Sequence, residues 1–413
     1  MVPLAGLALS YLACVAPDAA GKHEAARGQS AGPADSGAAD TGKREDSVDE
    51  SPYDDPLVQA AYVALFDVAV VQVVDITIQP ESVLLLDSEP ETWVSADVSV
   101  NGEMFANVGV KVRSGPEDAT ALAGKPNIKI KLDAFDGPPI AMCDRMLLEG
   151  MTDDPAMLRT VLGFDVWATA KLPGPQANFA VVSVNGEPMG LYANVEVMDK
   201  NWARRRLNID DDQLWEAHDS ADLTASGVDQ FEQVSGSGDV TVLLAAAHEI
   251  RAAGADFYTD VNDVIDMDAF LDFWAWNIAM GNRRVYPFQL GDSFVYAAAA
   301  DGRVAFVPHD MEVAWDTGTP FAWDEVIGVL GQQCLYYDAT CPSRMLAASG
   351  HALDGLDALA LGERLDALAL LTESFAADDP RKPYTTAQML TARTTLATRI
   401  DAYPSRLRTA MGL

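Results

Sequence analysis

Hydrophobic and polar residues alternate along much of the chain between residues 58 and 200. The segment 92–100 reads TWVSADVSV, and NVGVKV at 107–112 and NIKIKL at 127–132 repeat its period of two. This period predicts strands with one buried face. In the last of them Ile128 and Ile130 share one face, so Lys129 and Lys131 lie together on the other. Asn-Gly pairs at 101–102 and 185–186 predict turns, the second inside a hairpin over 179–197.

Beyond residue 200 the apolar residues mostly recur at helical spacing. The segments 240–254, 267–281, 353–372 and 385–411 are predicted helices. An earlier helix is predicted from Asp154 to Lys171, because acidic residues and a proline open it and LPGP ends it. One more β pair, SFVYAAAADGRVAFVPHD at 293–310, turns at Asp301 and Gly302.

These patterns predict an α+β fold with two lobes. A β-rich lobe covers about residues 56–199 and a mainly helical lobe covers 200–413, with the hairpin 293–310 inserted in the helical lobe. Atypical protein-kinase-like folds have this two-lobed layout, and a cleft between the lobes would hold a nucleotide.

The N-terminal region is predicted to lie outside this domain. Residues 1–17, MVPLAGLALSYLACVAP, are too short for a membrane span and are typical of an export signal. Cys14 follows Leu12 and Ala13 as in a lipoprotein processing site, although no basic residue precedes the apolar core. Two interpretations stay open: a lipid on Cys14, or a plain signal peptide with an incidental cysteine. Residues 18–55, rich in Ala, Gly, Ser and Asp, predict a disordered acidic linker.

Composition narrows the classes of partner and metal. The 413 residues include 28 Lys and Arg against 62 Asp and Glu, for a formal charge of −34, so nucleic acid is not expected as a partner. A lipid on Cys14 is the one membrane contact expected. Cys334 and Cys341 enclose a loop short enough to close as a disulfide in an exported protein, and Cys143 is expected to be a small buried hydrophobe. No cysteine and histidine set has the spacing of a zinc site.

Two groups of residues are candidates for chemistry. Asp310 and Glu312 follow a predicted strand two residues apart, and Asp292 opens the strand before it, so three carboxylates would suit magnesium. The alternative is an acidic rim on an acidic protein. Lys129 and Lys131 follow a glycine-containing loop, where a lysine can bind phosphate, but lysines on the solvated face of an edge strand look the same.

The order of several motifs resembles the CotH family of spore-coat and secreted protein kinases. The resemblance runs through about residues 60–320, and its most specific parts are NGEPMGLYANVEVMD at 185–199 and PHDMEVAW at 308–315. It implies an atypical kinase fold that binds ATP and magnesium, with manganese as an alternative, and phosphorylates serine on secreted or surface proteins. By their places in the family's motifs, Asp310 matches the metal ligand, and Lys129, with Lys131 as second choice, matches the phosphate-binding lysine. Glu196 matches the glutamate at the end of the hairpin. Arg113 and Ser114 match the start of the family's glycine-containing loop.

The chain departs from the family pattern at the catalytic aspartate. GNRRVYPFQLGD at 281–292 places Arg283 there, or Arg284 after a shift of one residue, and a guanidinium cannot accept a proton. The asparagine that usually opens the next strand is Asp292, which can still bind a metal. Three hypotheses follow: an exported transferase with weakened or lost activity, a pseudokinase-like surface lipoprotein that binds a partner, or a calcium-stabilised coat module.

Overall fold

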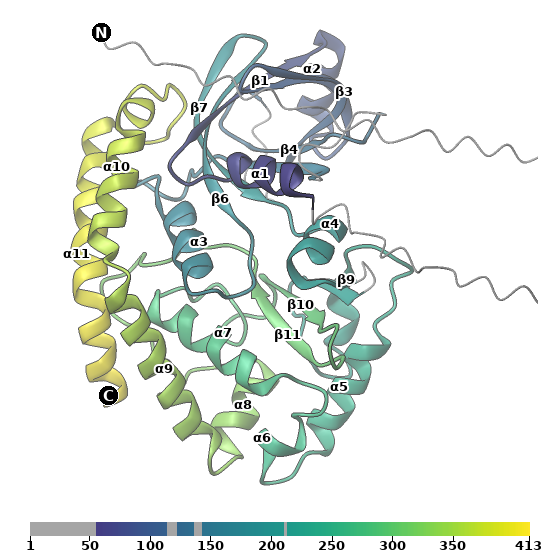
Figure 1. The fold of residues 1–413 in the computed structure, drawn as a ribbon, viewed down its shortest axis with the longest axis vertical. Coiled ribbons are helices and arrows are strands. Elements are labelled where there is room, and N and C mark those ends of the chain that lie inside the picture. The colour runs from purple at the N-terminus through teal and green to yellow at the C-terminus, as the bar shows by residue number, and fades with distance from the viewer. Residues whose placement is uncertain (1–54, 114–121, 136–142, 210–212) are drawn as a thin grey trace, which may run out of the picture.

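The computed structural model of the chain describes residues 55–113, 122–135, 143–209 and 213–413. Within these ranges seven strands form a closed barrel, four more form a second sheet, and helices pack around that sheet (Figure 1). The mixed α+β composition predicted from the sequence is confirmed. Cys14, Ser114 and all of the predicted linker except Asp55 lie outside the described residues. In the part of the chain that is described, no helix is long and apolar enough to cross a membrane.

The barrel is built from the strands that the alternating pattern predicts. Parallel pairing of β1 with β6 closes it, and every other pair of neighbouring strands is antiparallel. In spatial order the strands are β1 (Val71–Ile78), β2 (Val94–Val100), β3 (Glu103–Arg113), β4 (Asn127–Lys131), β5 (Arg145–Glu149), β7 (Glu187–Glu196) and β6 (Ala177–Val184).

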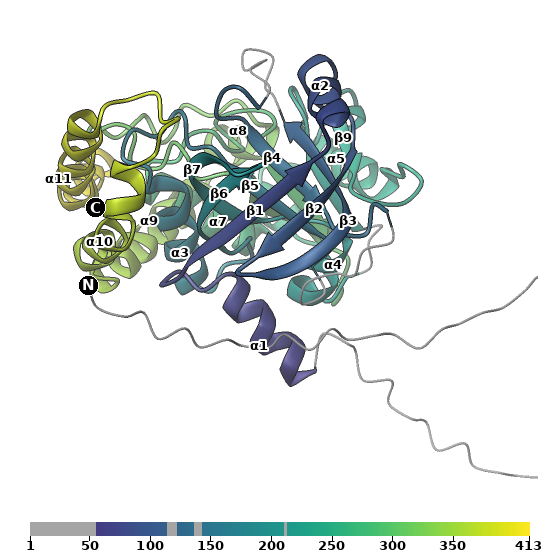
Figure 2. The same cartoon turned by 90° about the horizontal axis from the view of Figure 1, so that it is seen from above.

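Apolar side chains at alternate positions fill the barrel. Ile128 and Ile130 of β4 are fully buried in its interior, so Lys129 and Lys131 lie on its outer face, as predicted. Helix α1 (Pro56–Leu65) packs against the barrel and contributes Tyr62 to the interior cluster, and α2 (Pro80–Ser88) packs against β2. Figure 2 shows α1 outside the strands.

The second sheet has the order β11-β10-β8-β9. Its strands are β8 (Leu214–Ala217), β9 (Phe231–Gln233), β10 (Ser293–Ala297) and β11 (Val304–Pro308). The predicted hairpin over 293–310 is confirmed: β10 and β11 pair from Ser293 opposite Pro308 to Ala297 opposite Val304.

Helices make up most of the remaining described chain. They are α3 (Arg159–Thr169), α4 (Lys200–Trp202), the π-helix η2 (Ala203–Leu207), the 3-10 helix η4 (Val228–Gln230), α5 (Thr241–Ala252), α6 (Phe257–Asp260), α7 (Met267–Ala279), α8 (Val329–Tyr336), α9 (Cys341–Ala358), α10 (Leu361–Ala377) and α11 (Thr386–Met411).

Two of the predicted helix boundaries are wrong. The helix expected from Asp154 begins only at Arg159, because the Asp154 carboxylate accepts hydrogen bonds from the backbone N–H groups of Ala156, Leu158 and Arg159 and holds turns there. The segment 353–372 is not one helix, since Ala360 has a left-handed backbone (φ 48°) that separates α9 from α10.

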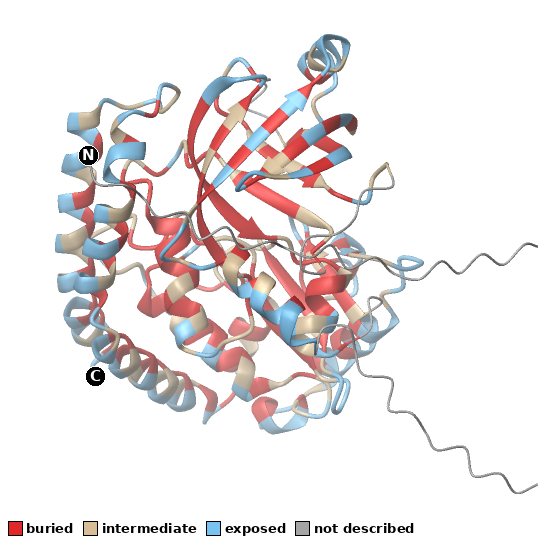
Figure 3. Cartoon of the chain, turned by 45° about the horizontal axis from the view of Figure 1, so that its top comes forward, coloured by how far each residue is buried: buried red, intermediate tan, exposed pale blue. Residues whose placement is uncertain are grey.

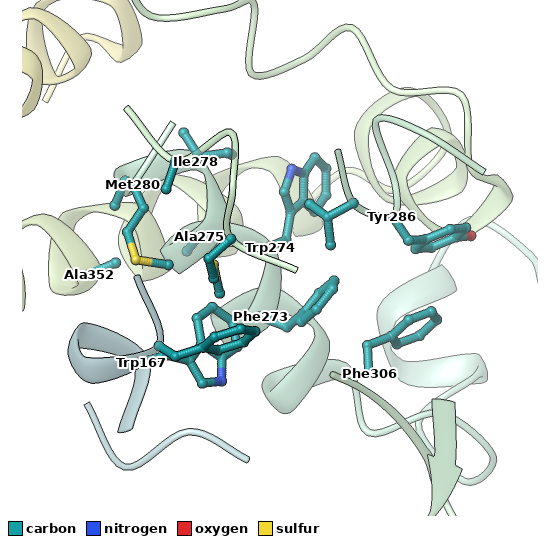
Figure 4. Packing of buried hydrophobic residues seen from close by; sticks show 14 of the residues in the cluster. Trp167, Phe273, Trp274, Ala275, Ile278, Met280, Tyr286, Phe306 and Ala352 are labelled. Atoms are coloured by element: carbon teal, nitrogen blue, oxygen red, sulfur yellow. The ribbon is translucent and has the colours of Figure 1, made fainter. Parts of the chain in front are cut away.

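One hydrophobic core joins the outer face of the barrel to the helices. Trp167 of α3 and Phe273 of α7 pack edge to face, and Phe306 of β11 stacks on Tyr286 with ring centroids 4.9 Å apart (Figure 4). The same cluster includes Leu147, Phe179 and other outward-facing strand residues. Buried residues are concentrated where these elements meet (Figure 3). The core is continuous across residues 199 and 200, so a division into two lobes there stays a prediction.

The cysteines take the states expected of them. Cys334 at the end of α8 forms a disulfide with Cys341 at the start of α9, with Cα atoms 5.2 Å apart. Cys143 is free and buried.

A buried ion pair ties the connection between α10 and α11 to the barrel. Lys125 Nζ lies 2.5 Å from Asp379 Oδ2, and their side chains are 2% and 0% exposed. The same carboxylate accepts the backbone N–H of Leu191 in β7 at 2.9 Å. Breaking such a pair leaves an uncompensated buried charge, which costs more than forming the pair gains.

We expect Asp379→Asn to lower the free energy of unfolding by about 3–5 kcal/mol, because it leaves the Lys125 ammonium buried without a counter-charge. Urea denaturation followed by tryptophan fluorescence would measure the loss. The control is Asp354→Asn, which disrupts an exposed pair with Arg408 and should cost less than about 1 kcal/mol. Equal stability of the two variants would contradict this role of Asp379.

Candidate functional site

The pairing of β10 with β11 brings acidic residues at the two ends of this hairpin together. Because Ser293 lies opposite Pro308, Asp292 meets His309, whose backbone N–H donates to the Asp292 carbonyl at 3.3 Å. One possible ligand atom each from Asp292, His309 and Asp310 lies within 4.8 Å of the other two. The two aspartates that the sequence analysis selected are therefore neighbours, and a histidine that it did not select stands between them.

The loop that carries Asp310 is anchored in the core. Met311 is fully buried and packs against Gly163 of α3, where a Cβ atom would come within 2.6 Å of the Met311 Cβ. The side-chain amide of the buried Asn282 donates to the Asp310 carbonyl at 3.1 Å. Asp310 and Glu312 do not lie on an extended segment, because the Glu312 N–H turns back to Asp310 Oδ1 at 3.3 Å. Both the backbone carbonyl and the side chain of Asp310 are therefore held by hydrogen bonds.

Of the two arginines, Arg284 is the one directed at the carboxylates. Its guanidinium donates to Glu312 and lies 4.0 Å from Asp292 Oδ2. The Arg283 side chain is 57% exposed and comes within 3.9 Å of Asp316. Burial opposes the charge on Arg284, but Asp310, Glu312 and Asp292 outweigh it and raise the Arg284 pKa. If Arg284 rather than Arg283 is aligned with the family's catalytic aspartate, that position lies among these carboxylates.

The carboxyl groups differ in the protonation state that they favour. Burial and the neighbouring Asp310 raise the pKa values of Asp292 and Glu312. Burial acts in the same direction on Asp310, but contacts with His309 and Arg284 outweigh it and lower its pKa. Asp310 is therefore the carboxylate most firmly ionised of these three.

Glu149, at the end of β5, belongs to the same group of carboxyl side chains as Asp310 and Glu312, and it was not predicted from the sequence. Burial, followed by the negative charges of Asp310 and Glu312, raises its pKa to about 8. The sequence around Glu149 gives no indication of this raised pKa, because the carboxylates that act on it lie more than 150 positions later in the chain. Near pH 7 the group consists of ionised Asp310 beside a largely protonated Glu149.

Lys129 of the barrel is linked to the same group through Glu216. Burial, followed by the charge of Arg113, lowers the Lys129 pKa to about 8, while Glu216 of β8 acts to raise it. Glu216 in turn lies 3.5 Å from His309 Nε2, so a chain of charged groups leads from Lys129 to Asp310. Lys131, two residues further along β4, is 3.8 Å from Asp133 instead. The structure thus separates two lysines that the alternating pattern treats alike.

Glu196 is not part of this group. Its carboxylate accepts hydrogen bonds from Tyr62 Oη at 2.8 Å and from the Gln176 N–H at 3.1 Å, and it pairs with Arg205. It lies opposite Met146, whose side chain fills the barrel interior, whereas Lys129 lies on the outer face. Glu196 was predicted as a cofactor-binding residue from its place at the end of the hairpin, and the structure places it on the other face of the barrel from Lys129.

The residues present fit a divalent cation. Asp292 and Asp310 offer oxygen ligands, and His309 Nδ1 is a buried atom with no hydrogen-bond partner among the described residues. A hollow of about 420 Å³, lined by residues that include Asp219, Asp222 and Thr224, lies in the connection between β8 and β9. Asp219 adds to the negative charge that acts on Asp292.

Fold and site define an α+β protein in which a barrel brings basic side chains to carboxylates and a histidine at the edge of a second sheet. The sequence profile of the CotH kinase protein family matches residues 121–348, more than half of the chain, and the chain belongs to that family. The match includes Lys129, Asp292 and Asp310.

Two further comparisons give weaker similarities. The inner spore coat protein H of Bacillus subtilis is 23% identical over 174 residues, which are 39% of this chain and 47% of that protein. The chain thus spans about half the length of this curated relative. A Shewanella oneidensis toxin–antitoxin complex of HipA and HipB with operator DNA aligns over 82% of this chain and 74% of its own, with a TM-score of 0.36 and 12% identity. That score is too low to define a shared fold.

Proposed function

We propose that the chain is an exported kinase that binds ATP with magnesium and transfers phosphate to serine side chains of secreted or surface proteins. The observation that carries the proposal is that Glu216, whose charge acts on Lys129 of the barrel, also lies 3.5 Å from His309, which is grouped with Asp292 and Asp310. Membership of the CotH kinase protein family supports it. Manganese is the alternative to magnesium.

Phosphoryl transfer is achieved mostly by positioning and by neutralising charge. Lys129, with Arg113 on the neighbouring strand β3, would supply positive charge for the phosphate oxygens, and Asp310 and Asp292 would hold the metal ion. That ion would supply the charge that offsets the phosphate oxygens during transfer. Because the chain is strongly acidic, binding of a nucleotide depends on these few cations rather than on a general positive field.

The acceptor hydroxyl also needs a base, and the family position for it holds an arginine. We assign this role to Glu149, which belongs to the same charged group and is a carboxyl that Arg284 does not bind. A pKa of about 8 suits a base working near neutral pH.

An extracytoplasmic place of action fits the expected export signal and the spore coat relative. A lipid on Cys14 would hold the chain at the cell envelope. The expected acceptors are then proteins of the secreted or surface compartment rather than nucleic acid or lipid.

The contact of Arg284 with Glu312 favours a second candidate function. A guanidinium among the carboxylates already neutralises part of the charge that would attract metal. In this alternative the chain is a catalytically inactive surface module that binds a partner protein.

We expect Lys129→Ala to weaken ATP binding in the presence of magnesium by about 10- to 100-fold, since a charge-assisted contact to phosphate contributes about 1.5–3 kcal/mol. Lys131→Ala is the matched control on the same strand and should change the dissociation constant less than about twofold. Isothermal titration calorimetry of both variants and the natural chain measures this difference. Equal losses in the two variants would remove Lys129 from the nucleotide site.

Glu149→Gln should lower γ-phosphate transfer from ATP to a serine-containing acidic acceptor by about 100-fold or more. Transfer by the natural chain should rise with pH up to about 8, because the base works only when deprotonated, and the variant should lose this rise. Radiolabel incorporation measures the rates, with Glu232→Gln, at the exposed position of β9, as the control.

Two results would contradict the assignments. A Glu149→Gln variant that keeps the natural rate and pH profile would exclude Glu149 as the base. A natural chain without transfer, with activity appearing in Arg284→Asp, would favour the inactive binding module.

A further inference from the structure

His309 has the surroundings of a metal ligand rather than of an ordinary core histidine. Its Nε2 lies 3.5 Å from Glu216 Oε1, and its Nδ1 lies 3.8 Å from Asp310 Oδ2, which is beyond hydrogen-bond length. Nδ1 is buried and finds no hydrogen-bond partner in the described part of the chain. One side of the imidazole is thus engaged by a carboxylate while the other faces Asp310 and Asp292.

The second sheet fixes the direction of this ring. The imidazole stacks on Phe294 of β10 with centroids 5.6 Å apart and an angle of 13° between the rings. Glu216 lies opposite Phe294 in the pairing of β8 with β10. Glu216 Oε1 lies 3.5 Å from His309 Nε2, so this carboxylate is the neighbour on the Nε2 side of the ring.

Histidines that bind metals usually donate their other ring N–H to a carboxylate, which fixes the tautomer and the ring plane. Glu216, His309 and the Asp292–Asp310 pair have this arrangement, with Nδ1 on the metal side. Without a metal, the carboxylate of Asp310 attracts a proton on Nδ1. A divalent cation would take the place of that proton.

We propose that His309 is a nitrogen ligand of the cation site formed with Asp292 and Asp310, and that it makes the site select manganese over magnesium. The proposal rests on the proposed function, since it uses the same site, and it names the class of metal. Magnesium prefers oxygen ligands and water, whereas first-row transition metals also bind imidazole nitrogen, and manganese is the one of them that the proposed function can use. The two aspartates alone would not make this distinction.

The test is binding of Mn²⁺ to the full chain, followed by electron paramagnetic resonance, with Mg²⁺ as competitor. His309→Asn offers an amide oxygen in place of Nδ1, so we expect Mn²⁺ affinity to fall at least about tenfold while Mg²⁺ affinity changes less than about threefold. His218→Asn is the matched control, because His218 also pairs with a glutamate, at 2.8 Å, on the same sheet. It should change neither affinity.

A second measurement does not depend on any variant folding. Electron spin echo modulation of bound Mn²⁺ should show coupling to a ¹⁴N nucleus in the natural chain. Absence of this coupling, or equal losses of Mn²⁺ and Mg²⁺ affinity in His309→Asn, would overturn the proposal.

The same readouts separate this proposal from the kinase proposal. Nitrogen-coupled Mn²⁺ in a chain that transfers no phosphate would leave His309 as a ligand and defeat the kinase function. Phosphate transfer by a chain whose bound Mn²⁺ shows no nitrogen coupling would support the kinase function and exclude His309 as a metal ligand.

Discussion

The antiparallel pairing of β10 with β11 is the constraint on which the site depends. It places Asp292, at the start of one strand, beside His309 and Asp310 at the end of the other. The aromatic contacts of Phe306 with Tyr286 and Phe273 hold the hairpin against α7, and Met311 fixes the following loop on α3. Loss of this packing would let Asp292 separate from His309 and Asp310, since they lie at opposite ends of the hairpin.

Charge compensation explains how so many acidic groups can lie together in an acidic protein. Asp310 is balanced by His309 and Arg284, Glu216 by His309 and Lys129, and Glu149 by taking up a proton. Buried charges are tolerated when each has a partner or can neutralise itself. An added divalent cation would change this balance, because it would compete with both the His309 proton and the Arg284 guanidinium.

The alternating pattern was sufficient for the barrel strands and for the outer position of Lys129 and Lys131. It could not choose between these lysines, because the choice depends on Glu216, which β8 brings from another sheet. Spacing was likewise unable to decide between Arg283 and Arg284, which occupy a turn after α7 where no period applies.

Some of the residues that were misplaced or missed had a signal in the sequence, and others had none. Glu196 shares its strand face with Tyr192, a barrel residue, so the period of two could have placed it inside. His309 had its position beside Asp310 as a signal. Glu149 had none, because its environment arises only when β5 closes next to the second sheet.

The central claim is that Asp292, His309 and Asp310 form a divalent cation site. The most direct measurement is a crystal structure of the chain grown with Mn²⁺, with data collected at the manganese absorption edge. We expect one strong anomalous peak bound by the two carboxylates and by His309 Nδ1. A map with no peak there, and with Arg284 still joined to Glu312 and Asp292 across the same space, would contradict the claim.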